Sequence, residues 1–523
     1  MKNTLERGSC SENGINPRAV YNFIERNEKE KLGVDSFMLL KGGKVVAEGY
    51  YNPYTNKTPH VEFSLSKSMS ATALGFALDE GKVSLDDSIC KYFPEYGKLW
   101  SNKRITVRHL VTMTAGKMIG MATARHKEDW IKIFFDTPPI APPGKLFLYV
   151  NDNFYLISAI ISRVYGVTLV DFLEPRLFKP LGIEKPFWEI DSFGYAAGGW
   201  GLYMPIEDLA KIMRCYSQMG KWNGKQVIPE KWIEEATKFQ TKTVKHGQPD
   251  VAQGYGYGIW MTSIPNAYRF YGLYGQLGYV FKDRDTVLVV NSGISKDMYL
   301  AAAINDMCKT LWDTPEEAFE TKLKDKLSRL GDKDILDKKE RNTALERKYS
   351  QKPLKTRSGT FASMLPATMS AVFDERVGHI DRFILDLKDN GELWLMWKEG
   401  EFVNEVKLGM DGKYAETPIE FGQLKMHACT KAAWLNPNVL RVIIRIKEAC
   451  VARQLDFDFS NEKHIRITNN SIPDLPNLAA HYVDFSGIPL TNALDSAIVK
   501  YIAPAVLAYG EPTFRVKKIK RIF

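Results

Sequence analysis

Two stretches of the chain have the spacing of apolar residues that one face of a helix requires. In residues 17–31 the apolar Val20, Phe23 and Ile24 stand among many charged residues. In residues 64–79 leucine, methionine and alanine recur at i, i+4 spacing, and a glycine follows where a helix would be capped. The first stretch predicts a helix that opens the fold, and the second predicts a buried helix that begins at a serine.

Runs of β-type residues surround these helices. The runs at 36–40 and 44–50 are separated by Lys41-Gly42-Gly43, which is typical of a hairpin, so two antiparallel strands follow the first helix. The region that follows is predicted to hold helices at 153–164 and 206–219 and, after them, strands at 254–261, 267–271 and 286–291. Strands at both ends with helices between them predict one sheet closed by distant segments, an α/β (α+β) arrangement.

Composition changes along the chain and predicts three parts. Residues 316–350 are dense in Glu, Lys, Asp and Arg, which predicts a charged helical linker after a first domain at 1–315. Residues 351–523 form a β-rich C-terminal domain, an antiparallel barrel or sandwich, because short β-type runs recur there between turn signals, at 382–387, 393–397, 439–446 and 454–459.

The overall composition is that of a globular protein, with 45% hydrophobic and 25% charged residues over 523 positions. The net charge of +9 comes from interspersed Lys and Arg, so no nucleic-acid partner is expected. The six cysteines are never paired as C-x-x-C, the N-terminus lacks the apolar core of a signal peptide, and no run approaches the roughly 18 apolar residues of a membrane span. We expect a cytoplasmic protein with no membrane partner and no obligate protein partner.

Ser64-Leu65-Ser66-Lys67 is an S-x-x-K motif at the start of the second predicted helix. Three-residue spacing places the hydroxyl and the ammonium group on the same helical face. A serine hydroxyl is a weak nucleophile, and a desolvated lysine nearby can have a pKa low enough to accept its proton. The motif therefore indicates a nucleophile, Ser64, beside a proton acceptor, Lys67.

The motif has a second interpretation, in which Ser64 is a helix N-cap and Lys67 only solvates the first turn. S-x-x-K also occurs at 88–91 and 460–463, in both cases without a following apolar helix. What favours chemistry at Ser64 is Tyr149-Val150-Asn151, a Y-x-N triplet on a loop that leads into an apolar helix. A tyrosine can shuttle a proton, and an asparagine amide can bind a substrate carbonyl or hold the lysine.

In order and surroundings these motifs resemble the penicillin-recognising serine hydrolases, a group that contains class C β-lactamases, D-alanyl carboxypeptidases and family VIII esterases. The resemblance covers roughly residues 15–310 and includes Ile105-Thr106-Val107-Arg108-His109-Leu110-Val111-Thr112-Met113-Thr114-Ala115-Gly116 and Ala197-Gly198-Gly199-Trp200-Gly201-Leu202. It implies an antiparallel sheet flanked by helices, a helical lobe, and an active site between them. It also implies that Ser64 is acylated while Lys67 and Tyr149 move protons, without a metal or cofactor.

The family's third motif, a K-T-G or H-T-G triplet, should lie on the strand that ends near residue 272. Aligning its glycine with Gly272 leaves Phe270 and Tyr271 where the family has a cation and a hydroxyl. Those two groups grip a substrate carboxylate in the family, so their loss argues against penicillins and peptide C-termini. Arg269 is a possible substitute for the cation, but a strand-edge arginine is more often solvated.

The resemblance places an oxyanion hole at the backbone N–H groups of Ser64 and Leu273. The residues expected to bind substrate or the oxyanion are Asn151, Gly272, Leu273, Gly275 and Gln276.

Other chemistries have little support in the sequence. There is no G-x-S-x-G elbow, no H-E-x-x-H and no P-loop, and His60 and His246 have no partners at metal-ligand spacing, so both are expected to be ordinary surface or loop residues. The leading hypothesis is a hydrolase of a small ester or amide. The alternatives are a true β-lactamase or D-amino-acid-specific peptidase, and a non-catalytic binding protein with the same fold.

Overall fold

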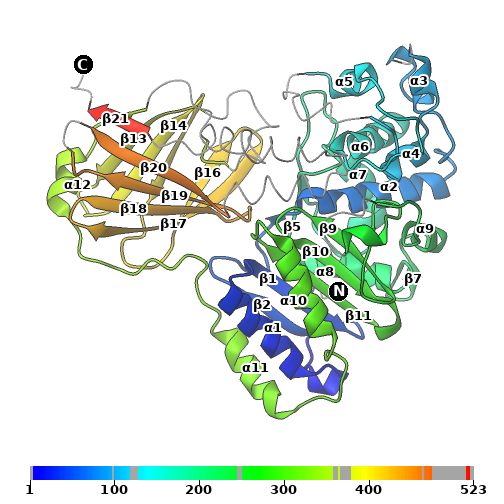
Figure 1. The fold of residues 1–523 in the computed structure, drawn as a ribbon, viewed down its shortest axis with the longest axis horizontal. Helices are drawn as coiled ribbons and strands as arrows, with labels where there is room; N and C mark the ends of the chain where they lie inside the picture. Colours follow the sequence, from blue (N-terminus) through cyan, green and yellow to red (C-terminus); the bar gives the residue numbers. More distant parts are fainter. Residues whose placement is uncertain are drawn as a thin grey trace, which may run out of the picture. The chain divides into compact units, whose positions relative to one another are not determined.

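The computed structural model of the protein describes residues 4–96, 99–117, 128–243, 250–356, 363–365, 379–461, 464–473 and 514–518. Within these residues the chain forms two compact units that divide between Gly331 and Asp332. Each unit has its own sheet (Figure 1), and each is described separately below.

A six-stranded antiparallel sheet organises the first unit. Its strand order is β2-β1-β11-β10-β9-β8, so the N-terminal hairpin lies beside strands from more than 200 residues later. The strands are β1 (Val34–Lys41), β2 (Lys44–Tyr50), β8 (Trp260–Met261), β9 (Ala267–Gly272), β10 (Gln276–Phe281) and β11 (Thr286–Ser292). The prediction of one sheet closed by distant segments is confirmed.

Helices pack on this sheet and on one another. Helix α8 (Ile206–Ser217) lies against β1, β10 and β11, and α1 (Pro17–Glu30) packs against α10 (Asp297–Cys308) and α11 (Ala318–Ser328). Figure 1 shows α1 and α11 side by side next to the β1–β2 hairpin. The predicted helices at 17–31 and 206–219 are confirmed to within two residues of their ends.

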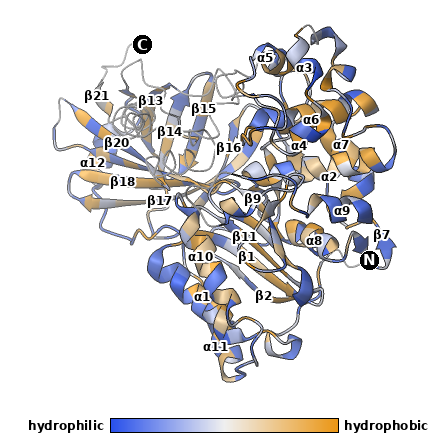
Figure 2. Ribbon diagram, turned by 45° about the vertical axis from the view of Figure 1, so that its right-hand side comes forward, coloured by the Kyte–Doolittle hydropathy of each residue, from blue (hydrophilic) through white to orange (hydrophobic). Residues whose placement is uncertain are grey.

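A helical lobe forms the rest of the first unit. Its buried centre is α2 (Ser66–Asp79) packed on α6 (Asn151–Tyr165), and Figure 2 shows α6 as a largely hydrophobic helix. The other helices of the lobe are α3 (Trp100–Lys103), α4 (Val107–Val111), α5 (Trp130–Asp136), α7 (Leu169–Leu173) and α9 (Glu230–Ala236). Short pieces complete the unit, namely η1 (Ser11–Asn13), β3 (His60–Val61), η2 (Phe63–Leu65), η3 (Ile89–Lys91), η4 (Pro94–Tyr96), η6 (Glu174–Phe178), β4 (Phe187–Trp188), β5 (Leu202–Met204), β6 (Lys221–Trp222), β7 (Lys225–Gln226), η7 (Val251–Gln253) and η8 (Lys282–Arg284).

One strand prediction in the first unit is wrong, and one strand was not predicted. The predicted strand at 254–261 is a strand only over its last two residues, β8, because Gly254 has a φ of 109° and the backbone turns there. Strand β10 is not among the strands predicted from the sequence, and the glycines at 272, 275 and 278 weaken the strand pattern there. Those glycines instead form the tight turn between β9 and β10 and a close packing contact with Met213 of α8.

Helices also occur in the charged segment between the two domains that the sequence predicts. Helix α11 packs on α1 in the first unit, and α12 (Thr343–Tyr349) packs on β13 in the second.

Six free cysteines lie in the two units. Among the described residues, no single helix is long and apolar enough to cross a membrane, and only α6 taken with the strongly bent segment Leu169–Phe178 meets that criterion as a pair.

The second unit is built from antiparallel strands. Their order is β15-β14-β13-β12-β21-β20-β19-β18-β17-β16, and no pairing between β15 and β16 closes the sheet within the described ranges. The strands are β12 (Leu354–Lys355), β13 (Ile380–Leu387), β14 (Leu393–Glu399), β15 (Phe402–Lys407), β16 (Ala415–Phe421), β17 (Leu424–Asn436), β18 (Val439–Ile446), β19 (Ala452–Asp458), β20 (Ile465–Ile472) and β21 (Phe514–Lys518). The prediction of a β-rich C-terminal domain is confirmed as antiparallel sheet.

Candidate active site

Ser64 lies in the short 3-10 turn η2, directly before the long helix α2. Phe63, the residue before it, has a φ of 43°, in the left-handed region that a bulky side chain rarely adopts. The predicted helix therefore begins two residues later than expected, and Ser64 is not its N-cap. The side chain of Ser64 keeps some solvent exposure while both of its neighbours are buried.

Lys67 lies in the first turn of α2 with only 1% of its surface exposed. Its Nζ donates to the Oγ of Ser64 at 2.8 Å, to the Oδ1 of Asn151 at 2.7 Å and to the carbonyl oxygen of Gly199 at 2.7 Å. An ammonium group has three donors, so these three oxygens satisfy it completely. None of the three acceptors is a carboxylate.

This set of partners controls which way the lysine can exchange a proton. The oxygens of Asn151 and Gly199 only accept, so they take two N–H groups in either charge state of Lys67. The third tetrahedral position on Nζ faces the Ser64 hydroxyl. It carries an N–H when Lys67 is charged and the lone pair when Lys67 is neutral. Burial lowers the pKa of Lys67 well below its ordinary value, against the opposing effect of the Asp152 carboxylate.

The Gly198-Gly199 turn brings the third acceptor to the lysine. Gly198 has a φ of 66°, and a Cβ there would lie 2.4 Å from the carbonyl oxygen of Phe154 in α6. A Cβ on Gly199 would lie 3.0 Å from the carbonyl oxygen of Asn151. Only glycine allows this turn to pack so closely on the start of α6. The sequence pattern includes both glycines, but a role for a backbone carbonyl was not predicted.

Three alternate serines fix α2 to the loops around it. The hydroxyl of Ser70 donates to the carbonyl oxygen of Gly198 at 2.7 Å, and that of Ser68 donates to Gly258 at 2.6 Å. The Oγ of Ser66 accepts from the backbone N–H of Leu202 at 3.2 Å. The helix that carries Lys67 is thus held by side-chain bonds to the backbone of its neighbours.

Tyr149 lies at the end of the loop that leads into α6 and is 6% exposed. The Nζ of Lys67 lies 4.8 Å from the centroid of its ring. Aromatic side chains surround the ring, with centroid distances of 5.3 Å to Trp260 and 6.3 Å to Tyr255. The structure therefore brings together Ser64, Lys67, Tyr149 and Asn151, all of which were singled out from the sequence.

The turn between β9 and β10 approaches the Ser64 turn. A Cβ on Gly272 would lie 2.3 Å from the carbonyl oxygen of Glu62 and 3.1 Å from the backbone nitrogen of Leu65, so glycine is required at this contact. The backbone N–H groups of Ser64 and Leu273 donate no hydrogen bond within the described part of the chain. Two such amides in neighbouring turns are what an oxyanion hole requires.

The side chain of Gln276 is committed to the turn itself, and Gly275 shapes the same turn. The buried Gln276 amide donates to the carbonyl oxygens of Leu273 at 3.0 Å and Ser292 at 2.7 Å. Both of its N–H donors are used, so none remains for a substrate. Gly275 has a φ of 86°, and a Cβ there would lie 2.6 Å from the Oγ of Ser292.

The strand positions where the family has its triplet are buried and occupied by aromatic side chains. Phe270 packs edge-on against Tyr216 of α8, and the Tyr271 hydroxyl donates to Asp297. The expectation that Arg269 is solvated is wrong. Arg269 is 1% exposed and donates to the Asp250 carboxylate at 2.9 Å and to the hydroxyl of Tyr279 at 3.0 Å.

Other residues considered from the sequence lie outside this cluster. Ser88 caps a short 3-10 turn, and Lys91 pairs with Asp87 at the surface, while part of the third S-x-x-K lies outside the described residues. His60 is buried with its Nε2 at 3.3 Å from Asp35, which corrects its expected place at the surface, and His246 is not in the described part. In the ranges that the structure describes, no group of three His, Cys, Asp or Glu is placed to hold a metal ion.

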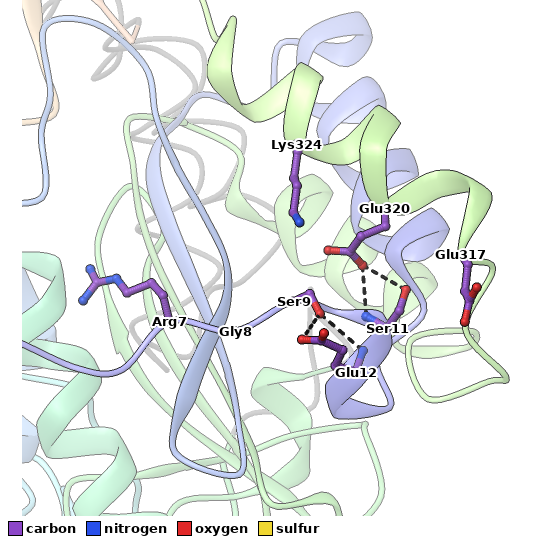
Figure 3. A pocket seen from close by; sticks show the side chains of 8 residues that line it. All are labelled: Arg7, Gly8, Ser9, Ser11, Glu12, Glu317, Glu320 and Lys324. Atoms are coloured by element: carbon purple, nitrogen blue, oxygen red, sulfur yellow. Dashed lines mark hydrogen bonds between the residues drawn. The ribbon is translucent and has the colours of Figure 1, made fainter.

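A polar cavity of about 570 Å³ lies elsewhere in the first unit, between the N-terminal segment and α11 (Figure 3). The Glu320 carboxylate accepts from the backbone N–H of Ser11 at 3.0 Å and from its hydroxyl at 2.9 Å. It also accepts from the backbone N–H of Cys10 at 3.3 Å. These contacts tie the N-terminal segment to α11, and the cavity contains none of the side chains around Ser64.

The fold and the site together define a class. An α/β fold with a six-stranded antiparallel sheet and a helical lobe, and a serine one helical turn from a buried lysine, is the arrangement of β-lactamase/transpeptidase-like serine proteins. The sequence model of the Beta-lactamase family matches residues 22–308, more than half of the chain. The chain belongs to the Beta-lactamase family.

Individual relatives are distant. The 6-aminohexanoate-dimer hydrolase of Paenarthrobacter ureafaciens is 24% identical over an alignment of 224 residues, with 39% of this chain and 57% of that protein covered. A β-lactamase of Escherichia coli (strain K12) is 26% identical over an alignment of 182 residues, with 30% of this chain and 48% of that protein covered. The chain thus spans about half the length of these two relatives. A penicillin-binding protein homologue from Caulobacter crescentus, a solved structure, is 17% identical with a TM-score of 0.45, over 55% of this chain and 93% of its own.

Proposed function

We propose that the protein is a serine hydrolase that acts on a small ester or amide through an acyl-enzyme on Ser64. The observation that carries the proposal is the set of partners around Lys67, in which two obligate acceptors leave the third direction for the Ser64 hydroxyl. A buried lysine with a lowered pKa and neutral partners is suited to accept a proton from a serine.

In the proposed mechanism the Oγ of Ser64 attacks the substrate carbonyl carbon while the neutral amine of Lys67 accepts its proton. The carbonyl oxygen becomes an oxyanion that accepts from the backbone N–H groups of Ser64 and Leu273. The intermediate then collapses, the bond to the leaving group breaks, and Tyr149 and Lys67 return the proton to the leaving group. A water molecule then attacks the acyl carbon while Tyr149 passes its proton to the neutral amine of Lys67. The bond between the acyl carbon and the Oγ of Ser64 breaks, Lys67 returns the proton to that oxygen, and the acid product and the free enzyme are released.

The side chains near β9 support substrates without a carboxylate that must be gripped. Phe270 is apolar, Tyr271 is committed to Asp297, and Arg269 is committed to Asp250. A buried arginine already paired with a carboxylate is a poor receptor for a second one. This favours esters and simple amides over penicillins and peptide C-termini.

An amide is the second candidate substrate, and one comparison favours it specifically. A relative with 24% identity is named as a hydrolase of the 6-aminohexanoate dimer. That dimer and a chromogenic cephalosporin therefore belong in the substrate panel beside nitrophenyl esters.

The first experiment is intact-mass measurement after reaction with a fluorophosphonate, on the wild-type chain and on Ser64→Ala. We expect a single adduct that the variant lacks, followed by measurable ester turnover and little cephalosporin turnover. Strong cephalosporin turnover would make β-lactam hydrolysis the main activity. No Ser64 adduct together with no turnover of any substrate would leave a non-catalytic binding protein.

Three further properties are part of the proposal. We propose a cytoplasmic location, which the six free thiols support and cell fractionation tests. We propose that the C-terminal unit is barrel-like and folds as a separate domain, which limited proteolysis and the unfolding of residues 332–523 alone would test. We also propose that the hydrolase needs no obligate protein partner, which turnover by the purified chain would test.

A further inference from the structure

Glu62 is a fully buried carboxyl two residues before Ser64. Its backbone carbonyl is the atom that β9 approaches at Gly272, so it lies between the Ser64 turn and the β9–β10 turn. Burial raises the pKa of Glu62 to about 8, against the effect of its hydrogen bond from Asn291. Within the described residues no charged side chain contributes to this shift.

Two amide side chains continue from this carboxyl to the second turn. The Nδ2 of Asn291, on β11, donates to the Oε1 of Glu62 at 3.2 Å and to the Oε1 of Gln276 at 3.2 Å. The Nε2 of Gln276 donates in turn to the carbonyl oxygen of Leu273 at 3.0 Å. All three side chains are buried, with at most 1% of their surface exposed.

The two ends of this chain of hydrogen bonds are the two turns whose amides would hold the oxyanion. We infer that Glu62, Asn291 and Gln276 form a positioning network that fixes the spacing of the Ser64 and Leu273 N–H groups. The inference rests on the proposed acyl-enzyme function. None of the three residues touches the substrate, so all three are positioning residues that act through the backbone of the turns.

An oxyanion hole stabilises the transition state and hardly affects the ground state, so a misplaced hole lowers kcat and leaves KM almost unchanged. Glu62 must accept from Asn291, and an amide oxygen can do this as well as a carboxylic acid. Glu62→Gln should therefore keep kcat for a nitrophenyl ester within about threefold of wild type. Glu62→Leu and Asn291→Leu remove the link, and each should lower kcat about 10- to 100-fold with KM changed less than threefold.

Two further measurements separate positioning from simple damage. Binding of a phenylboronic acid, whose tetrahedral adduct on Ser64 needs the hole, should weaken in parallel with the loss of kcat. The fall in kcat of the double variant Glu62→Leu/Asn291→Leu should be no larger than the larger fall of the two single variants, since each substitution removes the same contact. Glu189→Leu is the matched control, because Glu189 is also a fully buried carboxyl but bonds Tyr203 and lies outside the network. Glu189→Leu should lower the thermal stability of the protein while its kcat stays within threefold of the wild-type value.

The outcomes distinguish the network from the function on which it rests. Labelling and turnover at Ser64 with wild-type kcat in Glu62→Leu and Asn291→Leu would overturn the network alone. A loss of kcat in Glu62→Gln equal to that in Glu62→Leu would also overturn it, because an acceptor oxygen at this position would then not be enough to keep the two turns in place. If the leucine variants do not fold, Asn291→Ser, which cannot reach both acceptors, should show the same fall in kcat. No adduct at Ser64 in the wild type would overturn both proposals.

Discussion

Lys67 and Arg269 are two cationic side chains of the same unit, each about 1% exposed, but the charges of their partners differ. Lys67 donates to a hydroxyl, an amide oxygen and a backbone carbonyl, all neutral. Arg269 donates to the Asp250 carboxylate. Burial acts to lower the pKa of both, but for Arg269 the neighbouring Tyr279 and Asp250 outweigh it and the pKa is raised. Neutral partners thus leave a buried cation able to release its proton, whereas a carboxylate locks the charge in place.

Replacing Lys67 with a cation that cannot lose its proton is the strongest test of this difference. Lys67→Arg should lower kcat/KM for a nitrophenyl ester by about 100- to 10,000-fold, because a guanidinium cannot act as a base. Steady-state kinetics and circular dichroism check the loss and the fold.

Lys117→Arg is the control for that variant. Lys117 is also a buried lysine, and burial lowers its pKa to about 8, but its Nζ donates to the carbonyl oxygens of Phe134 and Phe135 and not to a serine. Its kcat per folded molecule should stay within threefold of wild type. Activity above a tenth of wild type in Lys67→Arg would mean that Lys67 is not the base.

Breaking the charged pair should affect stability and not chemistry. Asp250→Asn leaves Arg269 buried without a carboxylate, and we expect a loss of about 3–5 kcal/mol in the free energy of unfolding. Urea denaturation measures this, and kcat per folded molecule should stay within about threefold. A loss below 1 kcal/mol would show that Arg269 does not depend on Asp250.

The lowered pKa of Lys67 should also be visible as a difference in the pH dependence of stability between the wild type and Lys67→Met. Because its pKa is lower in the folded state than the ordinary 10.5, the unfolded chain binds more protons between these two values. The stability of the wild type should therefore rise with pH across that window relative to Lys67→Met. Urea denaturation at several pH values measures the difference, and parallel curves for the two proteins would contradict the lowered pKa.

The smallest effect on stability is expected from removing the second partner of Arg269. Tyr279→Phe removes the hydroxyl that accepts from Arg269 at 3.0 Å but leaves Asp250 in place. We expect a loss of about 1.5 kcal/mol in the free energy of unfolding, typical of a hydrogen bond to a charged group, with unchanged kcat. A loss as large as that of Asp250→Asn would mean that the hydroxyl and not the carboxylate holds Arg269.

The parts of the site that lie on one helix or loop could be predicted from the sequence. Ser64 and Lys67 are three residues apart, so helical geometry alone brings them to one face, and Tyr149 and Asn151 come from a single loop before a clear apolar helix. The sheet could be predicted because its hairpin and its late strands have plain β-type patterns. Strand β10 was missed because Gly275 and Gly278 interrupt the β-type pattern at its start.

Contacts between distant segments and roles of backbone atoms could not be predicted. The third acceptor of Lys67 is a carbonyl of Gly199, and a carbonyl oxygen is present at every residue, so nothing in the sequence singles it out. Arg269 donates to Asp250, which lies 19 residues earlier in the sequence, and neither residue lies in a recognisable motif. Gln276 was assigned to substrate because it stands beside the oxyanion turn, but burial commits its amide to that turn.

The serines that hold α2 have a consequence for how specificity could change in this chain. Ser66, Ser68 and Ser70 bond only backbone atoms, at Leu202, Gly258 and Gly198. These three bonds therefore do not depend on which side chains the two loops carry. Positions in these loops that do not contact Tyr149, as Tyr255 and Trp260 do, can be exchanged by drift or by an engineer while α2 keeps the same anchors, provided that residues 198, 199 and 258 remain glycine.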